Sequence, residues 1–197
     1  MRAAVVTVSD RSFRGERPDV SGPVLKTLLE LAGAEVVEAT VVPDDPAVLA
    51  QTLIRLADAL CCALIVTTGG TGLSPRDTTP EATRQVIDKD VPGMAEAIRQ
   101  DSLKQTPFAM LSRGIVGVRG QTLILNFPGS PKAVKECFAL VRPVLAHAVK
   151  LLRDDNPYAD ADHAFPHSSE AAGGRAPHVP QTHGRVVGRE AGPAGES

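Results

Sequence analysis

One stretch constrains this chain more than any other: Thr67-Thr68-Gly69-Gly70-Thr71-Gly72-Leu73-Ser74-Pro75-Arg76-Asp77. It follows residues 63–66, a short apolar run rich in β-branched side chains, which predicts a strand buried on both faces. It ends before Thr79 and Pro80, where the threonine is placed to cap a helix and the proline fits the first turn. The sequence therefore predicts a strand, a glycine-rich turn, a charged lip and a helix start.

The composition of this turn suits an anion such as a phosphate. Glycine lets backbone N–H groups approach a bound group closely, and threonine hydroxyls add further donors; the residues concerned are Thr68, Gly69, Gly70, Thr71 and Gly72. Asp77 adds a carboxylate beside them, where a metal ion could be shared with phosphate oxygens. The stretch is neither a Walker A sequence nor a dinucleotide fingerprint. Taken alone, it is as often a plain structural turn, because any doubly wound sheet must turn there.

Length and composition indicate one α/β domain with additional chain. We expect residues 1–153 to form the domain and residues 154–197, rich in Pro, Gly, Ala, Ser and His, to be a disordered tail. The histidine spacing in that tail fits no structural zinc site. A net charge of −2 favours neither nucleic acid nor membrane as a partner, so a small-molecule ligand is expected. An odd number of cysteines, all in apolar segments, predicts reduced core thiols and a cytoplasmic location; these are Cys61, Cys62 and Cys137.

The order of apolar runs and helical repeats predicts a three-layer α/β/α fold with a mostly parallel, doubly wound sheet. Strands are expected at residues 3–9, 36–42 and 63–66, with helices beginning near Ser21, Pro46, Pro80 and Pro92. Residues 114–118 and 121–126 read as an antiparallel edge hairpin. The last helix contains Pro143, which we expect to kink or split it.

Acidic residues follow two of the predicted strands. Ser9 and Asp10 fall at the same sheet edge as the glycine turn, although Asp10 could equally cap a turn or pair with Arg11. Asp45 is placed to cap the helix that begins at Pro46, which leaves Asp44 without a structural role. Asp44 is then either a second turn residue or a carboxylate facing Asp77. Two acids beside a triphosphate would bind Mg²⁺.

A second turn, residues 126–131, follows the predicted hairpin and leads into the last helix. Ser130 is placed as its cap, and the exposed helix N-terminus could receive another anionic group. The alternative is a plain connection from strand to helix. No histidine lies in the candidate pocket, which argues against an imidazole base and favours metal-assisted phosphoryl or nucleotidyl transfer.

Four segments in order resemble the molybdopterin-binding family, which includes MogA-type adenylyltransferases and the gephyrin G domain. They are Val8-Ser9-Asp10-Arg11, Val42-Pro43-Asp44-Asp45, the glycine turn with Pro-Arg-Asp-x-Thr-Pro-Glu-Ala, and Leu125-Asn126-Phe127-Pro128-Gly129-Ser130-Pro131. The resemblance spans residues 4–152. The chain has no insertion after Lys135-Glu136-Cys137, as in gephyrin-type domains, and its tail has no recognised counterpart.

The resemblance implies that the chain transfers AMP from ATP to molybdopterin, releasing pyrophosphate, in molybdenum cofactor biosynthesis. Asp44 and Asp77 match the two acids on which the family's catalysis depends, and we assign them to Mg²⁺ and the triphosphate. It also implies a wall of the pterin pocket after the signature turn, a homotrimer, and hand-off of the product to a molybdenum insertase. The substrate-binding residues that it implies are Ser9, Asp10, Thr68, Gly69, Gly70, Thr71, Gly72, Ser74, Arg76, Ser112, Asn126, Pro128, Gly129 and Ser130.

Three alternatives compete with this activity. A non-catalytic molybdopterin carrier or regulator would not need both acids. A metal insertase uses the same domain but carries further domains for which this chain is too short. A dinucleotide oxidoreductase would need a fingerprint spacing and a following acid, both of which are missing.

Overall fold

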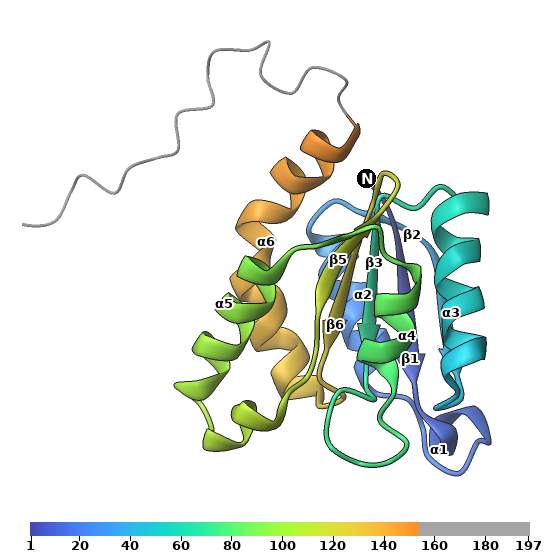
Figure 1. Cartoon of the computed structure of the whole chain (residues 1–197), viewed down its shortest axis with the longest axis vertical. Coiled ribbons are helices and arrows are strands. Elements are labelled where there is room, and N and C mark those ends of the chain that lie inside the picture. Colours follow the sequence, from blue (N-terminus) through green and yellow to red (C-terminus); the bar gives the residue numbers. More distant parts are fainter. Residues whose placement is uncertain (154–197) are drawn as a thin grey trace, which may run out of the picture. The chain divides into compact units, whose positions relative to one another are not determined.

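Six strands form one sheet in the order β2-β1-β3-β6-β5-β4 in the computed structural model, which describes residues 1–153 (Figure 1). The strands are β1 (Arg2–Val8), β2 (Glu35–Val42), β3 (Leu64–Thr68), β4 (Lys89–Asp90), β5 (Val116–Arg119) and β6 (Thr122–Phe127). The pairs β1–β2, β1–β3 and β3–β6 are parallel, whereas β5–β6 and β4–β5 are antiparallel. This confirms the predicted parallel sheet with an antiparallel edge.

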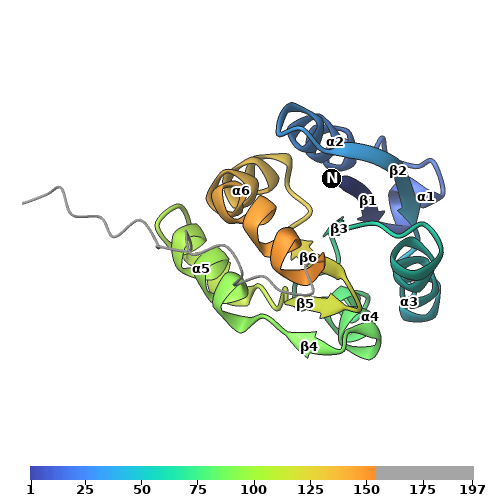
Figure 2. The ribbon, with the colours of Figure 1, turned by 90° about the horizontal axis from the view of Figure 1, so that it is seen from above.

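Helices cover both faces of the sheet. They are α1 (Asp10–Phe13), α2 (Ser21–Leu31), α3 (Pro46–Ile54), α4 (Thr79–Val86), α5 (Pro92–Leu103) and α6 (Pro131–Arg153), with a π-helical turn η1 (Arg55–Ala59) and a 3₁₀ helix η2 (Pro107–Leu111). Seen from above, α2, α5 and α6 lie on one side of the strands and α3 and α4 on the other (Figure 2). No helix within residues 1–153 is long and apolar enough to cross a membrane.

The core is divided between the two faces by the alternation of side chains along each strand. Ala3 and Val5 of β1 pack with α2 and α6, while Ala4 and Val6 pack with α3 and α4. Both sets are fully buried, which explains why the central strands are continuous apolar runs rather than alternating ones. The predicted three-layer architecture is confirmed.

The parallel strands all end at the same edge, and this decides where the site is. The carboxyl ends of β1, β2, β3 and β6 lie at the lower end of Figure 1, together with α1 and the loop between β3 and α4. Four segments that are far apart in the sequence are therefore neighbours there.

The predicted helix caps are partly correct. Asp45 caps α3 by accepting hydrogen bonds from the N–H groups of Ala47 and Val48, at 2.9 and 3.0 Å. Ser21 does not cap α2; Asp19 accepts the Gly22 N–H instead, at 3.0 Å. Thr79 is not a cap either, because it is already the first residue of α4 and its hydroxyl turns back to the glycine loop.

Two other expectations need correction, and two short elements were not predicted. Pro143 does not split α6, because it lies on the exposed side of the helix, where the carbonyl that loses its N–H partner can be hydrated. Cys61 is exposed rather than a core thiol, although Cys62 and Cys137 are buried and all three are free. β4 and η2 had no prediction, since each is short and is held by contacts from elsewhere in the chain. The predicted tail, residues 154–197, lies outside the described residues.

Candidate functional site

The glycine turn passes so close to neighbouring backbone that side chains are excluded. Gly69 and Gly70 have φ angles of 102° and 63°, in the left-handed region that favours glycine. A Cβ atom on Gly69 would lie 2.4 Å from the carbonyl oxygen of Val8. One on Gly129, in the turn after β6, would lie 3.3 Å from the Cα atom of Gly69. The turns after β1, β3 and β6 are therefore in direct contact.

Two buried threonines fasten these turns to one another. The hydroxyl of Thr68 donates to the carbonyl oxygen of Pro128 at 2.8 Å, and the hydroxyl of Thr79 donates to that of Gly69 at 3.0 Å. Both residues are 0% exposed. Their buried side chains therefore support the glycine turn from inside the protein, and the backbone of the turn forms the surface.

The charged lip of the loop is folded around Asp77. The carboxylate of Asp77 accepts the N–H of Ser74 at 2.9 Å, and the N–H of Asp77 donates to the carbonyl oxygen of Ser74 at the same distance. Ser74 and Arg76 are exposed. The carboxylate of Asp77 is thus held at the rim by a short ring of bonds.

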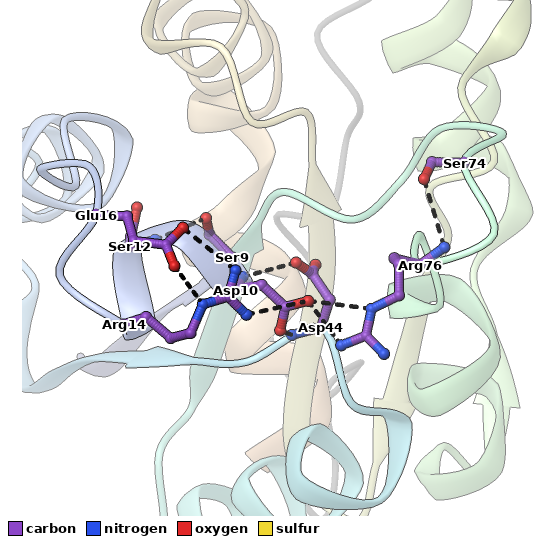
Figure 3. A network of polar contacts seen from close by, with 8 residues as sticks. All are labelled: Ser9, Asp10, Ser12, Arg14, Glu16, Asp44, Ser74 and Arg76. Carbon is purple, nitrogen blue, oxygen red and sulfur yellow. Dashed lines mark hydrogen bonds and ion pairs between the residues drawn. The ribbon is translucent and has the colours of Figure 1, made fainter.

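Asp10 and Asp44 are joined by a reciprocal pair of hydrogen bonds (Figure 3). The N–H of Asp10 donates to Oδ2 of Asp44 at 2.7 Å, and the N–H of Asp44 donates to Oδ1 of Asp10 at 3.0 Å. Asp44 therefore does have a structural role, contrary to the expectation from sequence. Asp10 pairs with Arg76 rather than with Arg11, through Nε at 3.0 Å and Nη2 at 2.7 Å.

The pKa values of the two carboxyls move in opposite directions. Burial raises the pKa of Asp44 above its usual value; the Asp10 N–H opposes this, and the negative charges of Asp10 and Asp77 add to it. For Asp10, desolvation acts upward, but hydrogen bonds from Arg76 and from the Asp44 backbone outweigh it and hold its pKa below the usual value. The lip that carries Asp77 reaches the same place, because Arg76 bonds Asp10 and Asp10 bonds Asp44.

Magnesium fits this arrangement only with oxygen ligands from a substrate. Among residues 1–153, no group of three or more His, Cys, Asp or Glu side chains is placed to hold a metal. Mg²⁺ in proteins is commonly bound by one or two carboxylates and substrate phosphates, with water completing the shell. Asp44 and Asp77 are the two carboxylates that the sequence predicts for such a set.

A cavity of about 240 Å³ opens on one side of the glycine turn. Thr71, Gly72, Ser112 and Pro128 from the predicted site line it. Its other walls are largely apolar and come from α5, η2 and the start of α6, which sequence reasoning placed there only by resemblance; these residues are Ile98, Arg99, Ser102, Thr106, Phe108, Ala109, Leu111, Ala133 and Glu136. The cavity suits a flat organic group with a few polar atoms.

A smaller hollow of about 110 Å³ lies on another side of the same turn. Ser9, Thr68, Gly69 and Gly129 line it together with the segment that leads into α2. The backbone around Gly69 and the turn that contains Pro128 and Gly129 therefore stand between two hollows. Hollows thus open on two sides of the turn.

Asn126 and Ser130 differ from the other predicted binding residues. Asn126 is 3% exposed, and its amide nitrogen donates to the hydroxyls of Thr67 and Thr83, both at 3.0 Å. Its side chain is thus engaged inside the protein, where it links β6 to β3 and α4. Ser130 is exposed at the start of α6, and its carbonyl oxygen accepts the Val134 N–H at 2.9 Å.

Sequence reasoning missed Arg113. Its Nε donates to the carbonyl oxygen of Gly72 at 2.7 Å, and its two terminal nitrogens reach the carbonyl oxygen of Asp77 and the carboxylate of Glu81. Its position directly after Ser112 is the signal that could have identified it. Its partners lie 32 to 41 residues away, so local sequence did not reveal its contacts.

The comparisons with known proteins agree with this geometry. The family described as "Probable molybdopterin binding domain" matches residues 4–147. The molybdopterin adenylyltransferase of Helicobacter pylori strain J99 is 40% identical over 150 residues, which cover 75% of this chain and 85% of that protein. The crystal structure of the molybdopterin biosynthesis enzyme MoaB from Thermus thermophilus is 50% identical, has a TM-score of 0.73, and is matched over 77% of this chain and 95% of its own.

A longer relative contains the same domain. The molybdenum cofactor synthesis protein cinnamon of Drosophila melanogaster is 45% identical over 162 residues, which are 81% of this chain but only 27% of that protein. The family match covers all four sequence segments and the whole carboxyl edge of the sheet. The chain therefore belongs to the molybdopterin-binding domain family, as a relative of the molybdopterin adenylyltransferases.

Proposed function

We propose that this protein is a molybdopterin adenylyltransferase of molybdenum cofactor biosynthesis, which transfers AMP from ATP to molybdopterin and releases pyrophosphate. One observation carries the proposal: Arg76, next to Asp77 in the charged lip, bonds Asp10, which in turn bonds Asp44, at the edge of a glycine turn that has a hollow on either side. Names of curated relatives support the same reaction. A protein that only bound the pterin would have no use for two carboxylates beside a phosphate-sized turn.

The reaction needs positioning more than covalent help from the protein. The terminal phosphate of molybdopterin is already an anion, and it attacks the α-phosphorus of ATP while the bond to pyrophosphate breaks. The glycine turn holds phosphate oxygens through its backbone N–H groups. Asp44 and Asp77 would hold Mg²⁺, which neutralises charge on the triphosphate.

The two hollows suggest how the substrates are divided. The 240 Å³ cavity, with its apolar walls, would take the pterin, and Ser112 and Thr71 would bind its polar edge. Gly70 and Gly72 would hold phosphates between the two hollows. Thr68 and Gly69 would support the turn, because the Thr68 hydroxyl donates to the carbonyl oxygen of Pro128 and the Gly69 N–H to that of Phe127. Ser9, Asp10, Ser74, Arg76, Pro128, Gly129 and Ser130 are assigned to the surrounding pockets, and Asn126 to the support of the turn.

The test is pyrophosphate release from ATP and Mg²⁺, with and without purified molybdopterin. Asp44→Asn and Asp77→Asn should each lower the pterin-dependent rate by about 100-fold or more, because several kcal/mol of charge stabilisation are lost. Asp45→Asn is the matched control, since Asp45 caps α3 and an asparagine caps as well. Binding of molybdopterin without pyrophosphate release above the variants' background would favour the carrier or regulator instead.

Three further features go with the proposed function. Residues 1–153 would be the catalytic domain, the active species would be a homotrimer in the cytoplasm, and adenylylated molybdopterin would be handed to a molybdenum insertase. Light scattering measures the oligomeric state directly. A monomer with full activity would remove the trimer from the proposal without affecting the reaction.

A further inference from the structure

We propose that Arg113 is a positioning residue that fixes Asp77 relative to the pterin cavity. This inference rests on the proposed function, since it gives Asp77 a catalytic task. Four hydrogen bonds carry it: the N–H of Arg113 donates to the carbonyl oxygen of Thr71 at 2.9 Å, and its guanidinium bonds to Gly72, Asp77 and Glu81. Within residues 1–153, no other side chain forms hydrogen bonds with both ends of the charged lip, residues 72–77.

The guanidinium of Arg113 joins the two ends of the charged lip. Its Nε bonds the carbonyl oxygen of Gly72 and its Nη2 bonds that of Asp77, so one rigid fork fixes the backbone at the two ends of residues 72–77. The residues between these ends, Leu73 to Arg76, are exposed and have little packing of their own. Without the fork, the lip would be held by the bonds of Asp77 to Ser74, by the Arg76–Asp10 pair and by the bonds of Thr79 to the glycine turn. None of these contacts joins the two ends of residues 72–77.

The backbone of Arg113 connects its guanidinium contacts to the cavity. Ser112 lines the 240 Å³ cavity, and so do Thr71 and Gly72, which Arg113 bonds through its N–H and its Nε. Arg113 therefore joins Ser112 to Thr71 and Gly72, which also line the cavity. The backbone N–H of Arg113 holds the cavity lining at Thr71, whereas its guanidinium holds the lip at Asp77.

The contacts with carbonyl oxygens matter more than the ion pair with Glu81. The side chains of Arg113 and Glu81 are 35% and 47% exposed, and ion pairs of that exposure contribute little to stability. Carbonyl oxygens, in contrast, need donors in fixed directions. A lysine at this position keeps the charge but cannot reach both carbonyls with a planar fork. Arg113→Lys consequently separates charge from geometry.

The kinetic experiment compares Arg113→Lys and Arg113→Gln with the wild-type protein in the pyrophosphate assay. Both should lower kcat about 10- to 100-fold and raise the Mg²⁺ concentration for half-maximal rate several-fold, as is typical when the support of a metal ligand is removed. The Kd for molybdopterin should stay within about twofold, since the bonds lost are not to substrate. Arg55→Gln is the control, because Arg55 pairs with Glu38 on the surface away from the site.

Hydrogen exchange of the full chain without substrates supplies a readout independent of activity. Arg113→Gln should speed exchange in peptides covering residues 69–78, and exchange in β1 and β6 should match the wild-type protein. Unchanged loop exchange, or a kcat and Mg²⁺ requirement like those of the wild type in Arg113→Lys, would overturn the inference. If the wild-type protein released no pyrophosphate, the proposed function would fail while the exchange result still decided whether Arg113 holds the loop.

Discussion

Asp10 and Asp44 each bind the other's backbone N–H through a side-chain carboxylate, at 2.7 and 3.0 Å, across 34 residues of sequence. This exchange fixes the end of β1 against the end of β2 at the point where Arg76 reaches in from the glycine loop. A residue expected to contact substrate is thus also the support of a residue expected to bind the metal. The carboxyl edge of the sheet is organised by such pairs.

Replacing Asp10 should distinguish its two contacts. Asp10→Asn keeps an acceptor for the Asp44 N–H but loses the charge that pairs with Arg76, whereas Asp10→Ala loses both. We expect a small loss of kcat for the asparagine and a loss of about 10- to 100-fold for the alanine, as for residues that orient a metal ligand. Steady-state pyrophosphate release measures both. Equal losses would show that the charge pair, and not the support of Asp44, is what matters.

Asp44 should lower the stability of the folded protein near neutral pH. Its pKa is raised on folding, mainly by burial, so the ionised carboxylate is disfavoured in the folded state wherever the pH exceeds that raised pKa. The penalty disappears as the pH falls from the folded pKa to the unfolded one. Asp44→Asn should therefore melt at a higher temperature than the wild-type protein at pH 7. The difference should shrink under acidic conditions.

Thermal melts from pH 7 to pH 4, with Asp45→Asn as the control, measure this effect. Asp45 is exposed and acts as a helix cap, so its asparagine variant should show no comparable pH-dependent gain. A melting temperature of Asp44→Asn below that of the wild-type protein at pH 7 would contradict the assignment of Asp44 as a disfavoured charge.

Two glycines with positive φ angles allow the cost of a left-handed backbone to be measured separately from the cost of a steric clash. Gly33 has a φ of 83° and open space where a Cβ would be, so Gly33→Ala should cost about 1–2 kcal/mol from the left-handed backbone alone. Gly69→Ala meets the Val8 carbonyl oxygen as well and should cost a further 1–3 kcal/mol, roughly, for displaced backbone. Urea unfolding measures both. Only the Gly69 variant should lose activity; a fully active Gly69→Ala would mean that the turn can shift without consequence.

The hydroxyl of Thr79 should stabilise the site from below. Thr79→Val keeps the shape but leaves the buried carbonyl oxygen of Gly69 without that donor, which should cost about 1–3 kcal/mol. Thr78→Val is the matched control, because the Thr78 side chain makes no capping bond. Denaturant titration of the pair gives the difference directly. If the two variants were equally stable, the carbonyl oxygen of Gly69 would have to accept a hydrogen bond from another donor.

Local sequence signals define the elements and the edge at which they converge. Runs such as residues 63–66 specify a buried strand, Asp45 before Pro46 specifies a helix start, and both signals act over a few residues. Because the carboxyl ends of parallel strands share one edge, the neighbourhood of Asp10, the glycine turn and Asp77 follows from those local signals.

Which groups bond across that edge depends on the three-dimensional arrangement of the chain. Arg113 reaches Gly72 over 41 residues and Arg76 reaches Asp10 over 66, while Thr79 bonds the loop instead of capping its own helix. A side chain can satisfy many possible partners, and its local sequence does not choose among them. The choice depends on the order and register of the strands, because these set which loops come within hydrogen-bonding distance.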